Sequence, residues 1–102
     1  MMADCAARAT AFQSLHREGL LLLANAWDPG SARLAAAAGA RAVATSSAAL
    51  AWAQGWPDGD ALPVPVLLDT VSRICDAVDL PVTVDIEGGY ADDPAEVADL
   101  AA

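Results

Sequence analysis

The segment Leu80–Tyr90, with the sequence LPVTVDIEGGY, places the strongest constraint on how this chain can fold. Its β-branched residues favour a strand, and a proline precedes them. Asp85 and Glu87 stand near its end with one residue between them, so the alternation of a strand predicts that both side chains share one face. The segment therefore predicts a strand over residues 82–87 that ends in two carboxylates.

Two interpretations of this acidic strand end remain open on spacing alone. In α/β folds, ligands bind at the carboxyl ends of parallel strands, so the pair is a candidate for a functional site. Two solvated acids where a strand runs into a loop would have the same sequence. Periodicity carries no information about ligands and does not decide between them.

The rest of the chain alternates between strand and helix patterns. Residues 20–27 form a nearly continuous apolar run, which is typical of a parallel strand buried on both faces. Residues 41–46 predict a second, shorter strand. Helical patterns are expected over residues 4–17, 32–38, 48–54, from Pro65 to Val78, and from Ala95 onward. This order predicts an α/β fold whose parallel strands are joined by right-handed crossovers.

Two further segments lie where the loops of such a fold meet its strand ends. Ser46 and Ser47 follow the second strand and open a helix, so they can cap that helix or receive an anion. The segment Gly55–Leu62 is rich in turn residues and carries Asp58. It predicts either a mobile loop over a site or an ordinary surface turn.

Charge and composition exclude some classes of function. The chain of 102 residues has a net charge of −9, and all five of its basic residues are arginines. Nucleic acid is therefore not an expected partner, because phosphate binding needs a basic face. The acidic excess suits a hard cation held by carboxylates. The longest apolar run is shorter than the roughly 20 residues that a membrane span needs.

The remaining reactive side chains predict little chemistry. Cys5 and Cys75 are too far apart in sequence for a zinc or redox motif, so we expect two free thiols. His16 is the sole histidine, and we expect it to cap a helix end or to lie on the surface. The N-terminus lacks the pattern of a signal peptide, which predicts a cytoplasmic protein.

Four motifs in order carry a resemblance to a known family. They are Asn25-Ala26-Trp27-Asp28, Ala44-Thr45-Ser46-Ser47, Gly55-Trp56-Pro57-Asp58-Gly59 and Val84-Asp85-Ile86-Glu87-Gly88-Gly89-Tyr90. Together, from about Phe12 to the end, they resemble the phosphoenolpyruvate mutase/isocitrate lyase superfamily. Four motifs at consistent spacing are far more specific than any one of them.

The resemblance implies a TIM (β/α)8 barrel, of which residues 1–102 would be a single incomplete domain holding the N-terminal helix and three βα units. It also implies a Mg²⁺-dependent carbon–carbon lyase or phosphonate mutase that acts on small oxo acids through an enolate. Three strands cannot close such a barrel, so we expect the isolated chain to be inactive. For the full-length protein we expect a homo-oligomer.

The resemblance also assigns roles to individual residues. It makes Asp85 the Mg²⁺ ligand with Glu87 as its outer-shell partner, although many members have Asp where Glu87 stands. The other implied site residues are Asp58 as a catalytic residue in a loop over the site, Ser46 and Ser47 at the substrate carboxylate, and Trp27 at the exit of the first strand.

Two competing hypotheses remain. The first is a small α/β domain that binds a cation or acts in signalling without catalysis, and such a domain would need closing strands of its own. The second is a truncated gene product without activity. Further βα units downstream, with another acidic strand end, would favour the barrel enzyme over the small α/β domain.

Overall fold

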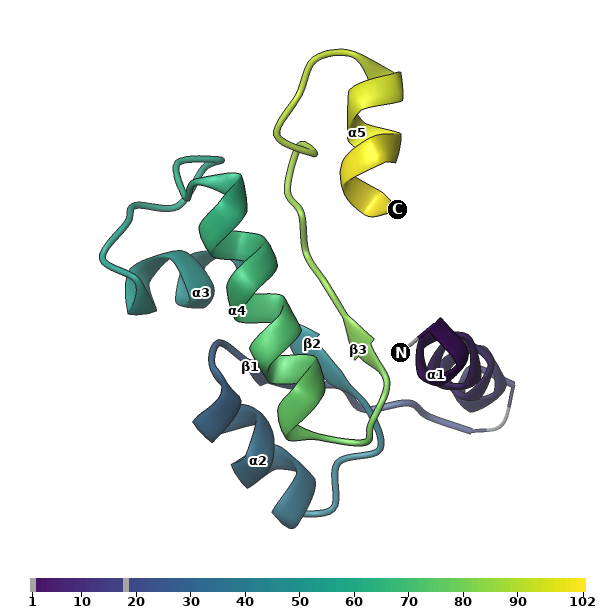
Figure 1. Ribbon diagram of the computed structural model, residues 1–102. Helices are drawn as coiled ribbons and strands as arrows, with labels where there is room; N and C mark the ends of the chain where they lie inside the picture. Colours follow the sequence, from purple (N-terminus) through teal and green to yellow (C-terminus); the bar gives the residue numbers. More distant parts are fainter. Residues whose placement is uncertain (1, 18) are drawn as a thin grey trace.

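The computed structural model describes residues 2–17 and 19–102, with the side chains of residues 2–4 excepted. Helices and strands follow each other along the chain as predicted (Figure 1). They are α1 (Met2–Leu15), β1 (Ala24–Ala26), α2 (Pro29–Ala37), β2 (Val43–Thr45), α3 (Ser47–Ala53), α4 (Val64–Ala77), β3 (Val82–Thr83) and α5 (Pro94–Ala101).

The strands form one parallel sheet in the order β1-β2-β3. Ala24 pairs with Val43, and Val43 pairs with Val82, so the three strands run in register through the middle of the molecule. The prediction of an α/β fold with parallel strands is therefore confirmed. A closed barrel is not formed by the residues that the structure describes.

The predicted strand over residues 82–87 is wrong beyond Thr83. The ladder ends there because the next contact from this segment to β2 goes to a side chain: the backbone N–H of Asp85 donates to Oγ1 of Thr45 at 3.1 Å. Glu87 then takes a φ of 53°, which leaves the extended conformation. Strand alternation therefore does not set the relative directions of Asp85 and Glu87.

The expectation that residues 20–27 are buried on both faces is also wrong. Leu20 is 85% exposed and Leu22 is 75% exposed, and only Ala24–Ala26 joins the sheet. A strand buried on both faces needs a layer on each side. Here α2 packs against β1, and β1 lies at an edge of the sheet.

The main core lies between the sheet and the helices α2 and α4, which pack side by side over it (Figure 1). Its buried side chains are small or β-branched: Ala26, Ala32, Val43, Ile74 and Val78. The alanines of α2 let this helix approach the strands closely. A proline in the first turn and a capping box from Asp28 begin α2 at Pro29, ahead of the predicted start at residue 32.

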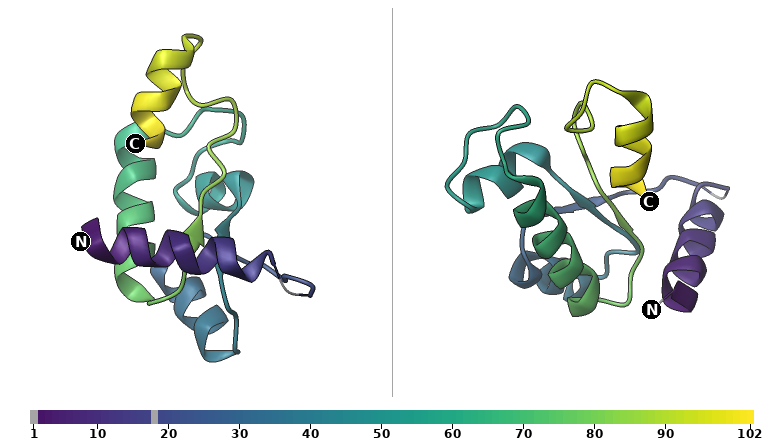
Figure 2. Two further views of the ribbon diagram at one scale, coloured as in Figure 1. Left: turned by 90° about the vertical axis from the view of Figure 1, so that its right-hand side faces the viewer. Right: turned by 45° about the horizontal axis from the view of Figure 1, so that its top comes forward.

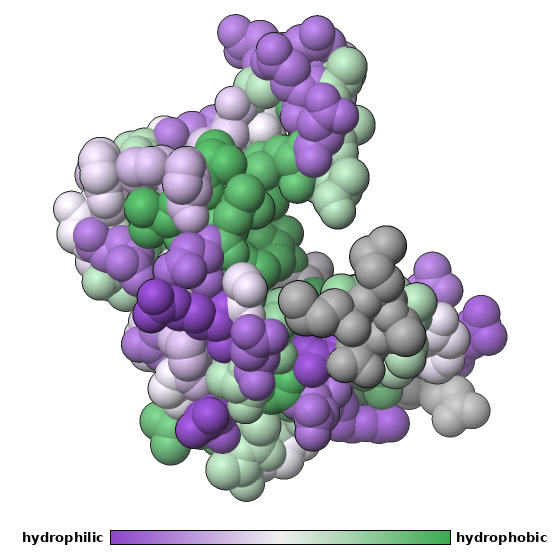
Figure 3. Space-filling model, in the orientation of Figure 1, coloured by the Kyte–Doolittle hydropathy of each residue, from purple (hydrophilic) through white to green (hydrophobic). Residues whose placement is uncertain are grey.

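A second cluster lies nearer the carboxyl ends of the strands. It is formed by Leu50, Ala51, Leu62 and Leu67, with Val84, Ile86 and Tyr90 packed against it. The segment after β3 is thus anchored by apolar contacts although it is not a strand. Figure 3 shows hydrophobic surface continuing on this side, between α4 and the C-terminal segment.

The N-terminal helix α1 lies apart from the pair α2 and α4 (Figure 2), and the side chain of Arg8 bonds it to the end of α4. Arg8 donates to the carbonyl oxygens of Cys75 at 2.9 Å and Val78 at 2.7 Å, which caps the end of α4. At the end of α1, the Nδ1 of His16 lies 2.7 Å from the carbonyl oxygen of Phe12, so the predicted capping role is confirmed.

Both cysteines are free, as predicted. Within residues 2–17 and 19–102, no helix is long and apolar enough to cross a membrane.

Candidate functional site at the strand ends

The carboxyl ends of the parallel strands lie at one edge of the sheet, and the predicted site residues follow them directly. Ala26 of β1 pairs with Thr45 of β2, so Trp27 and Ser46 each come one residue after this last pair. Asp85 joins the same edge through its hydrogen bond to Thr45. Topology thus brings three of the predicted site segments to one edge.

Asp85 is held by its neighbours while its carboxylate remains exposed. Its backbone donates to the hydroxyl of Thr45, which is 4% exposed and fixes this point to β2. Its Oδ1 accepts from the backbone N–H of Glu87 at 2.9 Å. The side chain is therefore oriented before any ligand arrives, as a binding group must be.

Glu87 reaches across to the loop between α3 and α4. Its Oε1 accepts from the N–H of Gly59 at 3.0 Å, and its Oε2 accepts from the N–H of Asp60 at 2.9 Å. Two consecutive amides thus bind one carboxylate. The loop carrying Asp58 is in this way brought to the acidic strand end, and the role of Asp58 in catalysis stays a prediction.

Tyr90 completes this arrangement, and the sequence motif gave it no role. Its hydroxyl donates to Oε2 of Glu87 at 3.2 Å, while its ring packs on the second core cluster. Burial, together with the hydrogen bond to Glu87, raises the pKa of Tyr90 to about 12. The phenol therefore stays protonated and remains a donor at neutral pH.

Thr45 was missed because a threonine inside a strand pattern is ordinarily a β former. The signal for Tyr90 was its position after two glycines at the end of the acidic motif. In that position it can fold back, and Gly89 takes a φ of 88°. The roles of Thr45 and Tyr90 can be recognised only from the structure of the turn after β3.

Ser46 and Ser47 occupy the start of α3. Ser46 is the N-cap, and its Oγ accepts from the N–H of Ala49 at 3.4 Å. The capping role is therefore confirmed, and a role in binding the substrate carboxylate stays a prediction. Both side chains are half-buried.

Trp27 is 40% exposed at the end of β1, and its backbone N–H donates to Oγ of Ser31 at 3.0 Å. The adjacent Asp28 binds the N–H of Ser31 at 2.7 Å, so this corner is a rigid helix start. Asp58 is exposed in the loop.

The donor chemistry at the strand ends suits Mg²⁺, but this chain supplies few ligands. Across residues 2–17 and 19–102, no group of three or more His, Cys, Asp or Glu residues could hold a metal ion. Asp85 is an exposed carboxylate of the kind that Mg²⁺ prefers, and Mg²⁺ commonly keeps several waters. Asp85 therefore fits as one ligand, and Glu87 already uses both oxygens to bind the loop.

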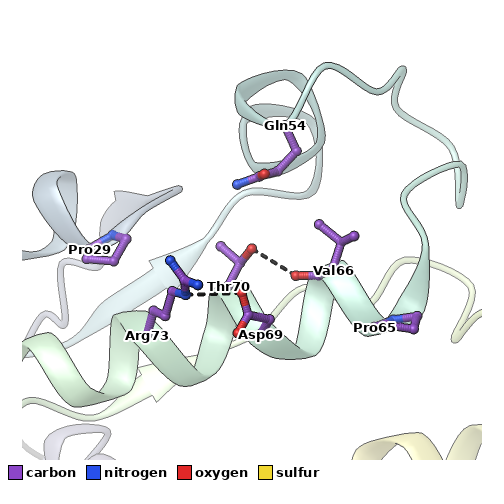
Figure 4. Close-up of a pocket in the computed structure, with 7 residues that line it drawn as sticks. All are labelled: Pro29, Gln54, Pro65, Val66, Asp69, Thr70 and Arg73. Atoms are coloured by element: carbon purple, nitrogen blue, oxygen red, sulfur yellow. Dashed lines mark hydrogen bonds and ion pairs between the residues drawn. The ribbon is translucent and has the colours of Figure 1, made fainter.

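A separate hollow of about 500 Å³ lies beside α4, away from these residues (Figure 4). Its most polar feature is the exposed ion pair between Arg73 and Asp69, at 3.0 Å along one helix. None of the residues at the strand ends lines it. This hollow has the features of an ordinary helix surface.

Comparison with known proteins identifies the family of this chain. The Phosphoenolpyruvate phosphomutase family profile matches residues 12–102. An uncharacterized protein of Mycobacterium tuberculosis is 35% identical over 92 residues, which cover 89% of this chain and 35% of that protein. The chain thus spans about a third of the length of this curated relative.

Solved structures agree with the profile. A candidate phosphonomutase of Burkholderia cenocepacia J2315 is 48% identical, with a TM-score of 0.87 over 91% of this chain and 38% of that one. A phosphoenolpyruvate phosphomutase of Streptomyces platensis is 31% identical, with a TM-score of 0.83 over 90% of this chain and 32% of that one.

A 2,3-dimethylmalate lyase of the PEP mutase/isocitrate lyase superfamily shares the fold, with a TM-score of 0.72 at 23% identity, over 95% of this chain and 34% of the lyase. Together with the profile, these structures confirm the resemblance seen in the four motifs. The chain belongs to the phosphoenolpyruvate phosphomutase family, within the phosphoenolpyruvate mutase/isocitrate lyase superfamily.

Proposed function

We propose that this chain carries part of the active site of a lyase or phosphonate mutase that acts on small oxo acids through an enolate. The observation that carries the proposal is the fixed, exposed carboxylate of Asp85 at the strand edge of a chain that belongs to this family. Strand-end carboxylates at the top of a parallel barrel are where such chemistry is placed.

Each predicted site residue has a role in this proposal. Asp85 is a direct ligand of Mg²⁺, and Glu87 is its outer-shell partner. Ser46 and Ser47 hold the substrate carboxylate, Trp27 lines the exit of β1, and Asp58 takes part in catalysis from its loop. The positions of these residues after β1, β2 and β3 support the assignment.

The metal would supply positive charge beside the substrate's carboxylate and oxo groups, where negative charge develops. The chain's own residues prepare that position. Thr45 fixes the backbone of Asp85, and the N–H of Glu87 orients its carboxylate. The apolar side chains of Val84 and Ile86 pack on the second core cluster and so keep the segment in place.

We further propose that residues 1–102 are the N-terminal part of a TIM barrel and are inactive alone. The chain spans 38% of the Burkholderia structure, and Leu20, Leu22 and the edges of the sheet are left uncovered. Exposed apolar surface and open strand edges promote association. For the complete protein we expect a cytoplasmic homo-oligomer.

The test compares two proteins. One is the chain of residues 1–102; the other, here called the completed chain, continues it with the remainder of the Burkholderia structure's sequence. Both are screened against small oxo acids and phosphonates with and without Mg²⁺. We expect Mg²⁺-dependent turnover only in the completed chain. Turnover by residues 1–102 alone would contradict the proposal, as would a folded completed chain that is inactive while the Burkholderia protein is active.

A further inference from the structure

The contact between Glu87 and the loop joins two segments that are far apart in sequence. The carboxylate binds two consecutive amides, from Gly59 and Asp60, at 3.0 and 2.9 Å. Hydrogen bonds to an ionised carboxylate are stronger than bonds between neutral groups, and two of them fix direction as well as distance. The loop between α3 and α4 is thus attached to the turn after β3 by a specific contact.

The turn itself is shaped for this contact. Three non-glycine residues of the described chain have positive φ angles, Asp60 at 61°, Glu87 at 53° and Tyr90 at 60°, and all three belong to this contact. Such conformations are unfavourable for residues with side chains and persist where the surroundings determine them. Gly88 allows a close approach, because a Cβ there would lie 3.1 Å from Oδ2 of Asp60.

Tyr90 links the contact to the core. Its hydroxyl donates to the same Oε2 atom that binds Asp60, and Tyr90 packs against the second core cluster. The position of the Glu87 side chain therefore depends on a residue that is itself held by apolar packing. Removing the hydroxyl alone would loosen the carboxylate and leave the ring in place.

We propose that Glu87 and Tyr90 form a clasp that holds the Gly55–Leu62 loop against the strand ends, and that both are positioning residues for Asp58. The clasp is a property of the fold and does not depend on the reaction. Its effect on catalysis through Asp58 rests on the proposed function.

Amide hydrogen exchange in residues 1–102, followed by NMR, tests the clasp directly. In Glu87→Gln, one acceptor oxygen is replaced by an amide group, so we expect the Gly59 and Asp60 amides to exchange at least about tenfold faster. In Tyr90→Phe we expect a smaller acceleration of the same two amides. The amide of Val43, which donates to the carbonyl of Pro81 at 2.9 Å, serves as an internal reference and should not change.

The matched control is Glu96→Gln, the same substitution at an exposed carboxylate in the first turn of α5. It should leave both loop amides unchanged. Equal exchange in Glu87→Gln and Glu96→Gln would overturn the clasp, and so would unprotected loop amides in the unmodified chain. Fast exchange of the Val43 amide would show that Glu87→Gln fails to fold. In that case Tyr90→Phe tests the clasp instead, and unchanged exchange of the loop amides in Tyr90→Phe overturns the proposal.

Two further readouts separate the clasp from the function. Added Mg²⁺ should leave the loop amides protected, and faster exchange would show Glu87 leaving the loop for the metal, which contradicts the clasp. In the completed chain, Tyr90→Phe should lower kcat about tenfold and change KM little, because it misplaces Asp58 without removing a binding group. If the loop amides exchange faster and kcat is unchanged, the clasp stands but its role in positioning Asp58 is refuted. If the unmodified completed chain shows no turnover, the result counts against the proposed function and leaves the clasp standing.

Discussion

In the layers formed by α2, β1, β2 and α4, the buried side chains are apolar except for Thr45 and Thr70. The region around Glu87 is held by hydrogen bonds between carboxylates and backbone amides in addition to its apolar contacts. We call these parts the apolar layers and the strand-end region, the latter comprising the Gly55–Leu62 loop and residues 84–90. Apolar packing is strong but has no direction, while hydrogen bonds fix individual groups. The difference indicates that the apolar layers supply most of the stability of the fold, whereas the strand-end region sets the positions of the candidate site residues.

The largest effect on stability is expected in the apolar layers. Ile74 of α4 is fully buried in the main core, so Ile74→Ala should lower the free energy of unfolding by about 2 to 5 kcal/mol. The control is Leu68→Ala on the same helix, where the side chain is 50% exposed and the loss should stay below about 1 kcal/mol. Urea denaturation measures both, and equal losses would remove the distinction between the layers and the surface.

Arg8 tests a polar contact that serves stability. Arg8→Ala removes two hydrogen bonds to carbonyl oxygens at the end of α4, so we expect a loss of about 1 to 3 kcal/mol in the free energy of unfolding. The ion pair of Arg8 with the exposed Asp79, at 3.9 Å, should add little. Arg33→Ala, at an exposed position on α2, is the control. If both variants melt alike, α1 is not held by this contact.

Thr45 lies where the two regions meet. Thr45→Val keeps the shape of a buried side chain but removes the acceptor for the N–H of Asp85, so we expect a loss of about 1 to 2 kcal/mol. The matched control is Thr70→Val, because the Thr70 hydroxyl donates to the Val66 carbonyl, which the helix already satisfies. That variant should lose less than about 1 kcal/mol. A larger loss from Thr70→Val than from Thr45→Val would contradict a link between β2 and Asp85.

The smallest effect is expected at the two thiols, which both line an apolar groove between α1, α4 and β3. Burial raises the pKa of Cys75, an effect that the nearby Arg8 charge opposes in part, whereas Cys5 is exposed. The raised pKa leaves less of Cys75 as thiolate at pH 8 than an ordinary cysteine would have, and its burial hinders access. Iodoacetamide should therefore modify Cys5 several-fold faster than Cys75. Labelling of Cys5→Ser and Cys75→Ser measures each thiol separately. Equal rates would mean that α1 does not cover Cys75.

The sequence predicted the order of elements well, because helix and strand periodicities are local. The cap at Ser46 and the loop before α4 were predictable for the same reason. The family was also predictable, because its motifs stand at the strand ends in the right order. The hypothesis of a small non-catalytic domain is weakened by this family membership.

The sequence did not predict where the strands begin and end, or the backbone conformation that follows them. The apolar run at residues 20–27 predicts burial, but burial requires covering layers that the described residues do not provide. The carboxylates of Asp85 and Glu87 were expected to share a face, yet β3 ends at Thr83 and Glu87 takes a positive φ. That turn depends on Gly59 and Asp60, which are distant in sequence, and on Tyr90. Such contacts are invisible to periodicity.

The most direct test of the account is Asp85→Asn in the completed chain, with turnover of an oxo acid and thermal melting measured on the same sample. Asp99→Asn, at an exposed position on α5, is the matched control. The account predicts that Asp85→Asn abolishes Mg²⁺-dependent turnover while the melting temperature changes little, because Asp85 serves placement and ligand binding and contributes little to packing. Unchanged turnover in Asp85→Asn, or loss of folding together with activity, would contradict it.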